Sequence, residues 1–486
     1  MRSFPPTVRL VAAPVIAATL LIAGCATRPA ATPAAVQHQL RDRPDLQLAW
    51  PQTDDARAEV DRTVTALLTR DLDTDTAAQI AVLNNRTLRA TFEELGFSQA
   101  EVLAAGRLRN PTLFASVRWP DRSPGGPDTE FSLGADLLDA TLLPLRKKIA
   151  AIELTQAERR VAHEVLQLIA EVKTAVANAQ AEAELRSRLT VLVDTADATA
   201  DLARRQYDAG NINRLELLVR QSTAQDARLD LARSEARLVA DREALNRLLG
   251  LWGPQTSWKL AALPPLPADD NVPADVEAVA IAHRLDLAVA KQRIALAQKA
   301  YDLKRRTRWF PGSINLGIDT EHSPDGQNVT GPNIALGLPI FDQGQSELAR
   351  LSAGVRQAQA RYDALATDIR SEARQARDTL AAARAAALVF QQTILPQNRL
   401  LLRETLLAYN AMQKSPYELI AAKEHELNIE RSSIEAVRDY WSARAELERA
   451  LGVPLAAPSP APVTPAAAPI PATAPSGNMP GMSAHP

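Results

Sequence analysis

The chain has 486 residues, and its 55 Lys and Arg nearly balance its 57 Asp and Glu. This balance argues against a nucleic-acid partner, which would require a basic stripe or patch. The single cysteine excludes an internal disulfide and any metal site built from several cysteines. Aromatic residues make up only 4% of the chain while alanine is abundant. That composition is typical of long helices that pack closely through small side chains.

The first 24 residues have the pattern of a lipoprotein signal peptide. Two arginines precede an apolar run at 10–23, which is shorter than the roughly 20 residues that a bilayer-spanning helix needs. The run ends in Leu-Ile-Ala-Gly-Cys, which resembles a bacterial lipobox, so we predict covalent lipid on Cys25 and no other cofactor. Ala26 favours sorting to the outer membrane. The alternative is an ordinary secretory signal with a chance cysteine, but the only cysteine lies where a lipobox requires it.

After an N-terminal segment at 25–70, a first unit is predicted at 71–252. Its elements, in order, are a helix opening at Asn85, strands at 112–119 and 130–138, a helix at 144–207, a turn at 207–210 and a returning helix at about 213–249. The long helix would extend roughly 95 Å at 1.5 Å per residue. No compact domain needs a rod of that length.

A second unit at 272–452, after a linker at 253–271, repeats this order about 200 residues later. Its elements are a helix opening at His283, strands at 314–321 and 333–340, a long helix from about Asp342, a turn at Tyr409 and a returning helix with Ser415 as N-cap and Pro416 at its first position. Solenoids and propellers have periods of roughly 20–50 residues. The chain therefore contains a duplicated domain.

Small and apolar residues of the long helices recur in steps of three and four, which is a coiled-coil seam. In the second unit the seam is Leu348, Leu351, Val355, Ala358, Tyr362, Leu365, Ile369, Ala373, Ala376, Leu380, Ala383, Ala387 and Phe390. The extra step from Ile369 to Ala373 is a stutter, which locally unwinds the supercoil. The first unit repeats the pattern more weakly at Val165, Leu168, Val172, Ala175 and Ala179.

The predicted strands have the length that a tilted strand needs to cross a bilayer. In the first, Leu113, Ala115 and Val117 share one face while Ser116 and Arg118 share the other. This alternation suits a barrel with a lipid-facing exterior and a wet interior. Four strands cannot close a barrel, so closure in lipid requires several chains.

The tail at 453–486 contains ten prolines and is predicted to be disordered. Near its end lie Met479, Met482 and His485, whose thioether and imidazole groups suit Cu(I). A polar terminus without metal is the alternative.

Together, the lipobox at Cys25, the doubled unit and three short motifs resemble the TolC-like outer membrane efflux family. The motifs are Leu-Pro-Ile-Phe-Asp-Gln-Gly at 338–344 and the turns at 207–210 and 409–412. The resemblance covers about 70–452 and is greatest to the lipoprotein members, the outer membrane factors of tripartite pumps. It implies a mainly α-helical fold with a small membrane β-barrel portion. A long coiled-coil tunnel would adjoin four strands per subunit of a trimeric twelve-stranded barrel.

The resemblance also implies partners. Members are homotrimers in outer membrane lipid of Gram-negative bacteria, and their helical tips meet a periplasmic adaptor (membrane fusion) protein. The adaptor links to an inner-membrane transporter, expected here to be of the RND type. Conduction would be passive, and no enzymatic site is expected. His163-Glu164 lacks the second histidine of a zincin.

Carried onto this chain, the resemblance assigns adaptor docking to two hairpin tips. The docking residues are Tyr207, Gly210, Asn211, Leu215, Tyr409, Met412, Pro416 and Leu419. The candidate periplasmic gate residues are Asp208, Glu216, Arg403 and Glu418. The second tip departs from the pattern, because Met412 occupies the place of Gly210, which makes its turn geometry an open point.

Three functions are compatible with these patterns: an efflux channel, a lipid-anchored periplasmic coiled-coil scaffold without a pore, and a type I protein secretion channel. The strands between the helices favour a channel. The cargo, whether metal ions such as copper and silver or drugs, is open.

Overall fold

The structure is a computed structural model that describes residues 33–40, 43, 46–119, 121, 126–309, 314–323, 325–336 and 340–456. The predicted lipidation site Cys25 lies outside the described residues, as do Met479, Met482 and His485. The start of the predicted tail is ordered, since Leu455 is buried in the second core and the Arg444 guanidinium donates to the Ala456 carbonyl.

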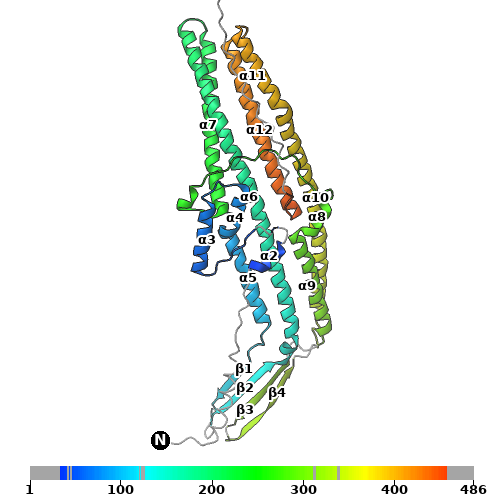
Figure 1. The fold of residues 1–486 in the computed structure, drawn as a ribbon. Helices are drawn as coiled ribbons and strands as arrows, with labels where there is room; N and C mark the ends of the chain where they lie inside the picture. Colours follow the sequence, from blue (N-terminus) through cyan, green and yellow to red (C-terminus); the bar gives the residue numbers. More distant parts are fainter. Residues whose placement is uncertain are drawn as a thin grey trace, which may run out of the picture.

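The molecule is elongated, with a sheet at one end and long helices extending from it (Figure 1). Helices α2 (Pro33–Gln39) and α3 (Asp54–Leu67) come first. The first repeat then consists of α4 (Thr74–Asn84), α5 (Arg86–Ala105), β1 (Thr112–Arg118), β2 (Asp128–Asp136), α6 (Leu137–Asp208) and α7 (Arg214–Leu249). After η1 (Gly253–Thr256), the second consists of α8 (Val276–His283), α9 (Leu285–Thr307), β3 (Ile314–His322), β4 (Asn328–Leu336), α10 (Gln345–Val389), η2 (Phe390–Ile394), α11 (Leu395–Asn410) and α12 (Pro416–Leu451). The shared order confirms the duplicated helix–strand–strand–helix unit.

The sheet is antiparallel in the order β1-β2-β3-β4, so the pairing of β2 with β3 joins the two repeats. Strands β1 and β3 lie within one residue of their predicted bounds. Strand β2 starts and ends two residues before the predicted 130–138. It ends at Asp136 because this carboxylate accepts hydrogen bonds from the backbone N–H groups of Leu138 and Asp139 and so begins α6.

The predicted bounds of the fourth strand were wrong by four to five residues. Strand β4 occupies 328–336 instead of 333–340, so the preceding loop is confined to 323–327. Pro332 suggested a loop, yet it pairs with Ile318 inside the ladder. A proline is tolerated there because β4 is an edge strand, which leaves one side of its backbone without a partner.

Helix α6 is continuous over 72 residues and starts earlier than predicted. Pro144 lies inside it, where the missing N–H removes one helical hydrogen bond without ending the helix. The corresponding helix of the second repeat was predicted from about Asp342 to Tyr409, and the structure has one uninterrupted helical run from Gln345 to Asn410. The π-helical turn η2 lies inside this run between α10 and α11, just before Pro396, whose ring would clash with the carbonyl of a regular α-helical turn.

The predicted seams form the cores of the two repeats. In α10, Ile369 and Ala373 are both fully buried, so the stutter keeps the seam directed inward. The other buried seam residues are Val355, Ala358, Ala376, Leu380 and Ala387 in α10 and Val165, Leu168, Val172 and Ala179 in α6. No helix in the described part of the chain is both long and apolar enough to cross a membrane.

Candidate functional site

One face of the sheet is apolar and exposed. The register places Leu133 between Leu113 on β1 and Ile318 on β3, so alternate residues of all four strands gather on this face. Its large side chains are 47% to 71% exposed: Leu113, Phe131, Leu133, Leu316, Ile318, Ile334 and Leu336. An exposed apolar surface of this kind marks a lipid or protein interface. The predicted separation of apolar and polar residues on β1 is confirmed.

The opposite face carries the carboxylates of the sheet, although the exposed Phe114 and Val329 also lie on it. These carboxylates are Asp128, Glu130, Asp136, Asp319 and Glu321, and Arg118 is the only basic residue that the described strands place there. The Arg118 guanidinium lies 2.7 Å from the Glu130 carboxylate. Glu130 also lies directly opposite Glu321 in the register, an arrangement of like charges that destabilises a sheet. The Asn333 side chain donates hydrogen bonds to Ser132 and Asp319 and so connects three strands.

The first hairpin tip, at the other end of the molecule, closes with a Schellman motif. The N–H of Gly210 donates to the Tyr207 carbonyl at 2.9 Å, and the N–H of Asn211 donates to the Gln206 carbonyl at 2.8 Å. Gly210 has φ +75°, the left-handed conformation that this motif requires. Helix α7 then starts from the N-cap Asn213, whose side chain accepts from the Glu216 N–H.

The second tip has the same geometry despite its different sequence. The N–H of Met412 donates to the Tyr409 carbonyl at 2.9 Å, and the N–H of Gln413 donates to the Ala408 carbonyl at 2.9 Å. Met412 adopts φ +60° and is 94% exposed. The absence of glycine therefore does not change the turn, although a non-glycine residue in this conformation is strained.

Ser415 and Pro416 begin α12 as predicted, with Ser415 and Glu418 forming a capping box. The Glu418 carboxylate accepts from the Ser415 N–H at 2.8 Å and lies 2.7 Å from the Lys414 ammonium. The Lys414 ammonium and the Ser415 N–H lower the pKa of Glu418 to about 2. Glu418 is thus engaged within its own tip, which provides a structural role for this predicted gate residue.

The other predicted gate residues are not brought together within one chain. Asp208 pairs with Arg204 one helical turn away at 3.4 Å, while Glu216 and Arg403 are exposed. The docking candidates Tyr207, Leu215, Tyr409 and Met412 are exposed, and Pro416 and Leu419 are half-buried.

A contact between the two tips was not predicted. The Tyr417 hydroxyl of α12 donates to the Gln206 side chain of α6, and the Arg220 guanidinium of α7 lies 4.7 Å from the centre of the Tyr417 ring. Tyr417 thereby connects both hairpins near their ends. Only its place directly after Pro416 in a tip indicated a special position.

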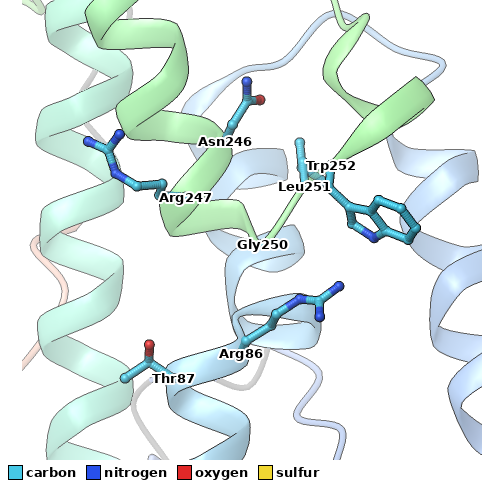
Figure 2. A pocket seen from close by; sticks show the side chains of 7 residues that line it. All are labelled: Arg86, Thr87, Asn246, Arg247, Gly250, Leu251 and Trp252. Carbon is cyan, nitrogen blue, oxygen red and sulfur yellow. The ribbon is translucent and has the colours of Figure 1, made fainter.

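A hollow of ≈ 480 Å³ lies where α7 ends beside the start of α5 (Figure 2). Its lining residues are Arg86, Thr87, Asn246, Arg247, Gly250, Leu251 and Trp252. At the end of α7, the Asn84 side chain donates to the carbonyls of Leu249 and Gly250. Gly250 has φ +69°, and a Cβ there would approach the Asn84 carbonyl oxygen to 2.4 Å. This contact closes the first repeat, and Gly452 beside His283 is its counterpart in the second.

A buried carboxylate connects three parts of the chain. Glu448 of α12 lies 2.6 Å from the Lys173 ammonium of α6 and 3.0 Å from the Arg43 guanidinium of the N-terminal segment. Arg444, at 4.0 Å, is a third cation. Burial alone would raise the pKa of Glu448, but these cations outweigh burial and hold the pKa below its ordinary value.

Within the part of the chain that the structure describes, no group of three or more His, Cys, Asp or Glu side chains is arranged to hold a metal ion. The half-buried His163 accepts or donates a hydrogen bond with Gln167 at 3.0 Å, and burial lowers its pKa.

Residues 77–251 match the family model described as Outer membrane efflux protein. The first repeat is therefore similar to this family over most of its length. The Cobalt-zinc-cadmium resistance protein CzcC of Cupriavidus metallidurans is 25% identical over 328 residues, which are 66% of this chain and 76% of that protein.

Solved structures of outer membrane channels share the fold. Crystal structures of CusC, which concern folding and transmembrane channel formation, align with a TM-score of 0.65 at 18% identity over 79% of this chain and 92% of theirs. The open-state MtrE outer membrane channel of Neisseria gonorrhoeae aligns with a TM-score of 0.63 at 19% identity over 78% of this chain and 89% of its own. The predicted TolC-like fold is confirmed.

Proposed function

We propose that this chain is the outer-membrane channel of a tripartite efflux system. The observation that carries the proposal is the sheet, whose one face is apolar and exposed and whose other face holds all the carboxylates of the described strands. A strand that separates lipid from water needs this division. The match of residues 77–251 to the outer membrane efflux protein model and the shared fold support the same function.

In this proposal three copies each contribute four strands to one twelve-stranded barrel, and the helices continue it as a periplasmic tunnel. Open edges at β1 and β4 support such an assembly, because unpaired strand edges are not tolerated in lipid. Lipid on Cys25 would add an anchor. The tips would dock a periplasmic adaptor that links the channel to an inner-membrane transporter of the RND type.

Conductance of single channels in a planar bilayer tests the proposal. The purified trimer should insert and conduct, whereas Ala115→Lys and Val117→Lys should prevent insertion because each lysine costs about 2–4 kcal/mol on a lipid-facing strand. Ser116→Lys is the matched control, since Ser116 lies on the polar face of the same strand. A soluble monomer without conductance would contradict the channel and support the scaffold. Equal tolerance of all three lysines would also contradict it.

For the cargo we propose divalent metal cations. The relative CzcC is named for resistance to cobalt, zinc and cadmium. In three copies, the acidic residues of the polar face would surround the lumen with an excess of negative charge, which raises the local concentration of cations. Drugs and secreted proteins are the competing cargoes.

The reversal potential in a salt gradient tests this assignment of cargo. The channel should prefer cations, and Asp319→Asn with Glu321→Gln should reduce that preference by several-fold. Glu59→Gln with Asp61→Asn removes the same charge from exposed positions of α3 and should leave the preference unchanged. A channel that prefers anions or has no preference would contradict metal cargo. Unchanged tolerance of cells to zinc, cobalt and cadmium after deletion of the gene would contradict it as well.

A further inference from the structure

Basic side chains gather where the helices meet the sheet. We call these residues the basic collar: Arg107, Lys147, Lys148, Lys304, Arg305, Arg306 and Arg308. They come from the loop after α5, from the first turns of α6, and from the end of α9 and the residue after it. All of these segments adjoin the sheet end of the molecule (Figure 1).

Close contacts place the collar in two groups, one at α5 and α6 and one at α9 and the start of α10, and α6 packs against α9. The Lys147 side chain lies 3.9 Å from the position of a Cβ built on Gly106, one residue before Arg107. Around Gly344, just before α10, the Lys304 side chain comes within 2.9 Å and Arg308 within 3.5 Å of the corresponding position. The collar therefore lies at the ends of the helices, next to the strands.

The collar has an excess of positive charge that the chain offsets only in part, through the electrostatic interaction of Lys304 with Glu347. None of the seven side chains forms an ion pair with another described residue. The nearby carboxylates already have partners: Asp139 pairs with Arg109 and Arg146, and Glu347 pairs with Arg350. Arg107, Lys147, Lys148, Arg305 and Arg306 are exposed.

The position of the collar fits the polar layer of a membrane. The apolar sheet face lies on one side of it, and the four members of the collar at the end of α9 span about 6 Å between Lys304 and Arg308 at 1.5 Å per residue. A headgroup layer is about 5–8 Å thick, given roughly 30 Å for the hydrocarbon core and 40–45 Å in total. Trp309 is exposed beside Arg308, whose guanidinium lies 4.4 Å from the ring centre, and tryptophan is enriched at this depth.

We propose that the basic collar binds the headgroups of anionic phospholipids in the inner leaflet of the outer membrane. This inference rests on the proposed function, which places the sheet in that membrane. Phosphodiester groups match the exposed guanidinium and ammonium groups in charge and hydrogen-bonding geometry. Each Lys or Arg at an anionic membrane surface contributes about 1 kcal/mol, which corresponds to about fivefold in binding.

Lipid binding to the full-length trimer tests the proposal. The trimer in neutral detergent is titrated with phosphatidylglycerol or phosphatidylethanolamine, and bound lipids are counted by native mass spectrometry. The unaltered trimer should prefer phosphatidylglycerol, and Arg305→Gln with Arg306→Gln should weaken that preference about 25-fold. Arg361→Gln with Arg370→Gln removes equal charge from exposed sites far along α10 and should leave it unchanged.

Four results would overturn the proposal: no lipid preference in the unaltered trimer, an equal loss in the control, displacement of the lipid by inorganic phosphate at matched ionic strength, or dissociation of the Arg305/Arg306 variant into monomers. The last would show that the collar pairs with a neighbouring subunit. Conductance in pure phosphatidylethanolamine bilayers separates the two proposals, because a channel that conducts there without a lipid preference refutes only the collar.

Discussion

Met412 shows that one residue can keep a turn while storing strain. Gly210 and Met412 occupy equivalent positions in the two tips, with φ +75° and +60° and equivalent hydrogen bonds. The sequence difference suggested a changed turn, but the helix ends on both sides determine the backbone. Packing does not explain why one position has glycine and the other methionine. Nothing lies within 4 Å of a Cβ built on Gly210, and the Met412 side chain is 94% exposed.

Met412→Gly should therefore stabilise the second tip, and Gly210→Met should destabilise the first. The left-handed conformation destabilises a folded non-glycine residue by about 1–2 kcal/mol. Glycine loses more conformational entropy on folding, which reduces the expected gain in stability by about 0.5–1 kcal/mol. Hydrogen exchange of the Gln413 amide, which donates to the Ala408 carbonyl, should slow by about threefold in Met412→Gly. Ala411→Gly is the control, because Ala411 has φ −80° and gains nothing from glycine. Slower exchange in that variant too would contradict the strain.

At the scale of elements, local signals predicted more than long-range ones. The capping by Ser415, the reversal at Gly210 and the seams all follow from residues close in sequence, and the structure contains them. The fourth strand was misplaced because Pro332 favours a loop locally while an edge of a sheet tolerates it. The π-helical turn was missed although Pro396 marked it. The contacts of Tyr417 and Glu448 join segments more than 200 residues apart, and one sequence carries no signal for such pairs.

The closure of the first repeat leads to a prediction about Gly250. Gly250→Ala should lower the stability of the first repeat by about 2–4 kcal/mol, because left-handed strain adds to overpacking against the Asn84 backbone. Gly253→Ala is the matched control: it has φ +57° and open space around it, so only about 1 kcal/mol of strain is expected. Exchange of the Leu251 amide, which donates to the Asn246 carbonyl, would report the difference. Equal effects in both variants would show that the close approach to Asn84 relaxes freely.

The whole molecule is connected at Glu448, where the N-terminal segment, α6 and α12 meet in one ion cluster. The pKa of this carboxyl is lowered in the folded chain, so its stabilising contribution is complete above the ordinary value of 4.5 and is lost as pH falls through the lowered pKa. Unfolding followed by circular dichroism should therefore show stability declining below about pH 4.5. At neutral pH, Glu448→Gln should cost about 3–5 kcal/mol because one buried and two half-buried cations lose their partner.

The acid dependence separates this cluster from the many surface ion pairs. Glu448→Gln should also flatten the decline in stability below pH 4.5, since the titrating group is gone. Glu446→Gln is the control, because the Glu446 side chain is half-exposed and its partner Arg449 is more exposed than the cations of the cluster. This variant should lose no more than about 1 kcal/mol of unfolding free energy and should keep the acid dependence. If the Glu446 variant lost as much stability as the Glu448 variant, general surface charge would explain the pH dependence.

Arg43 belongs to neither repeat, so loss of the cluster should also release the N-terminal segment. Faster proteolysis near residue 43 in the Glu448 variant alone would demonstrate that connection.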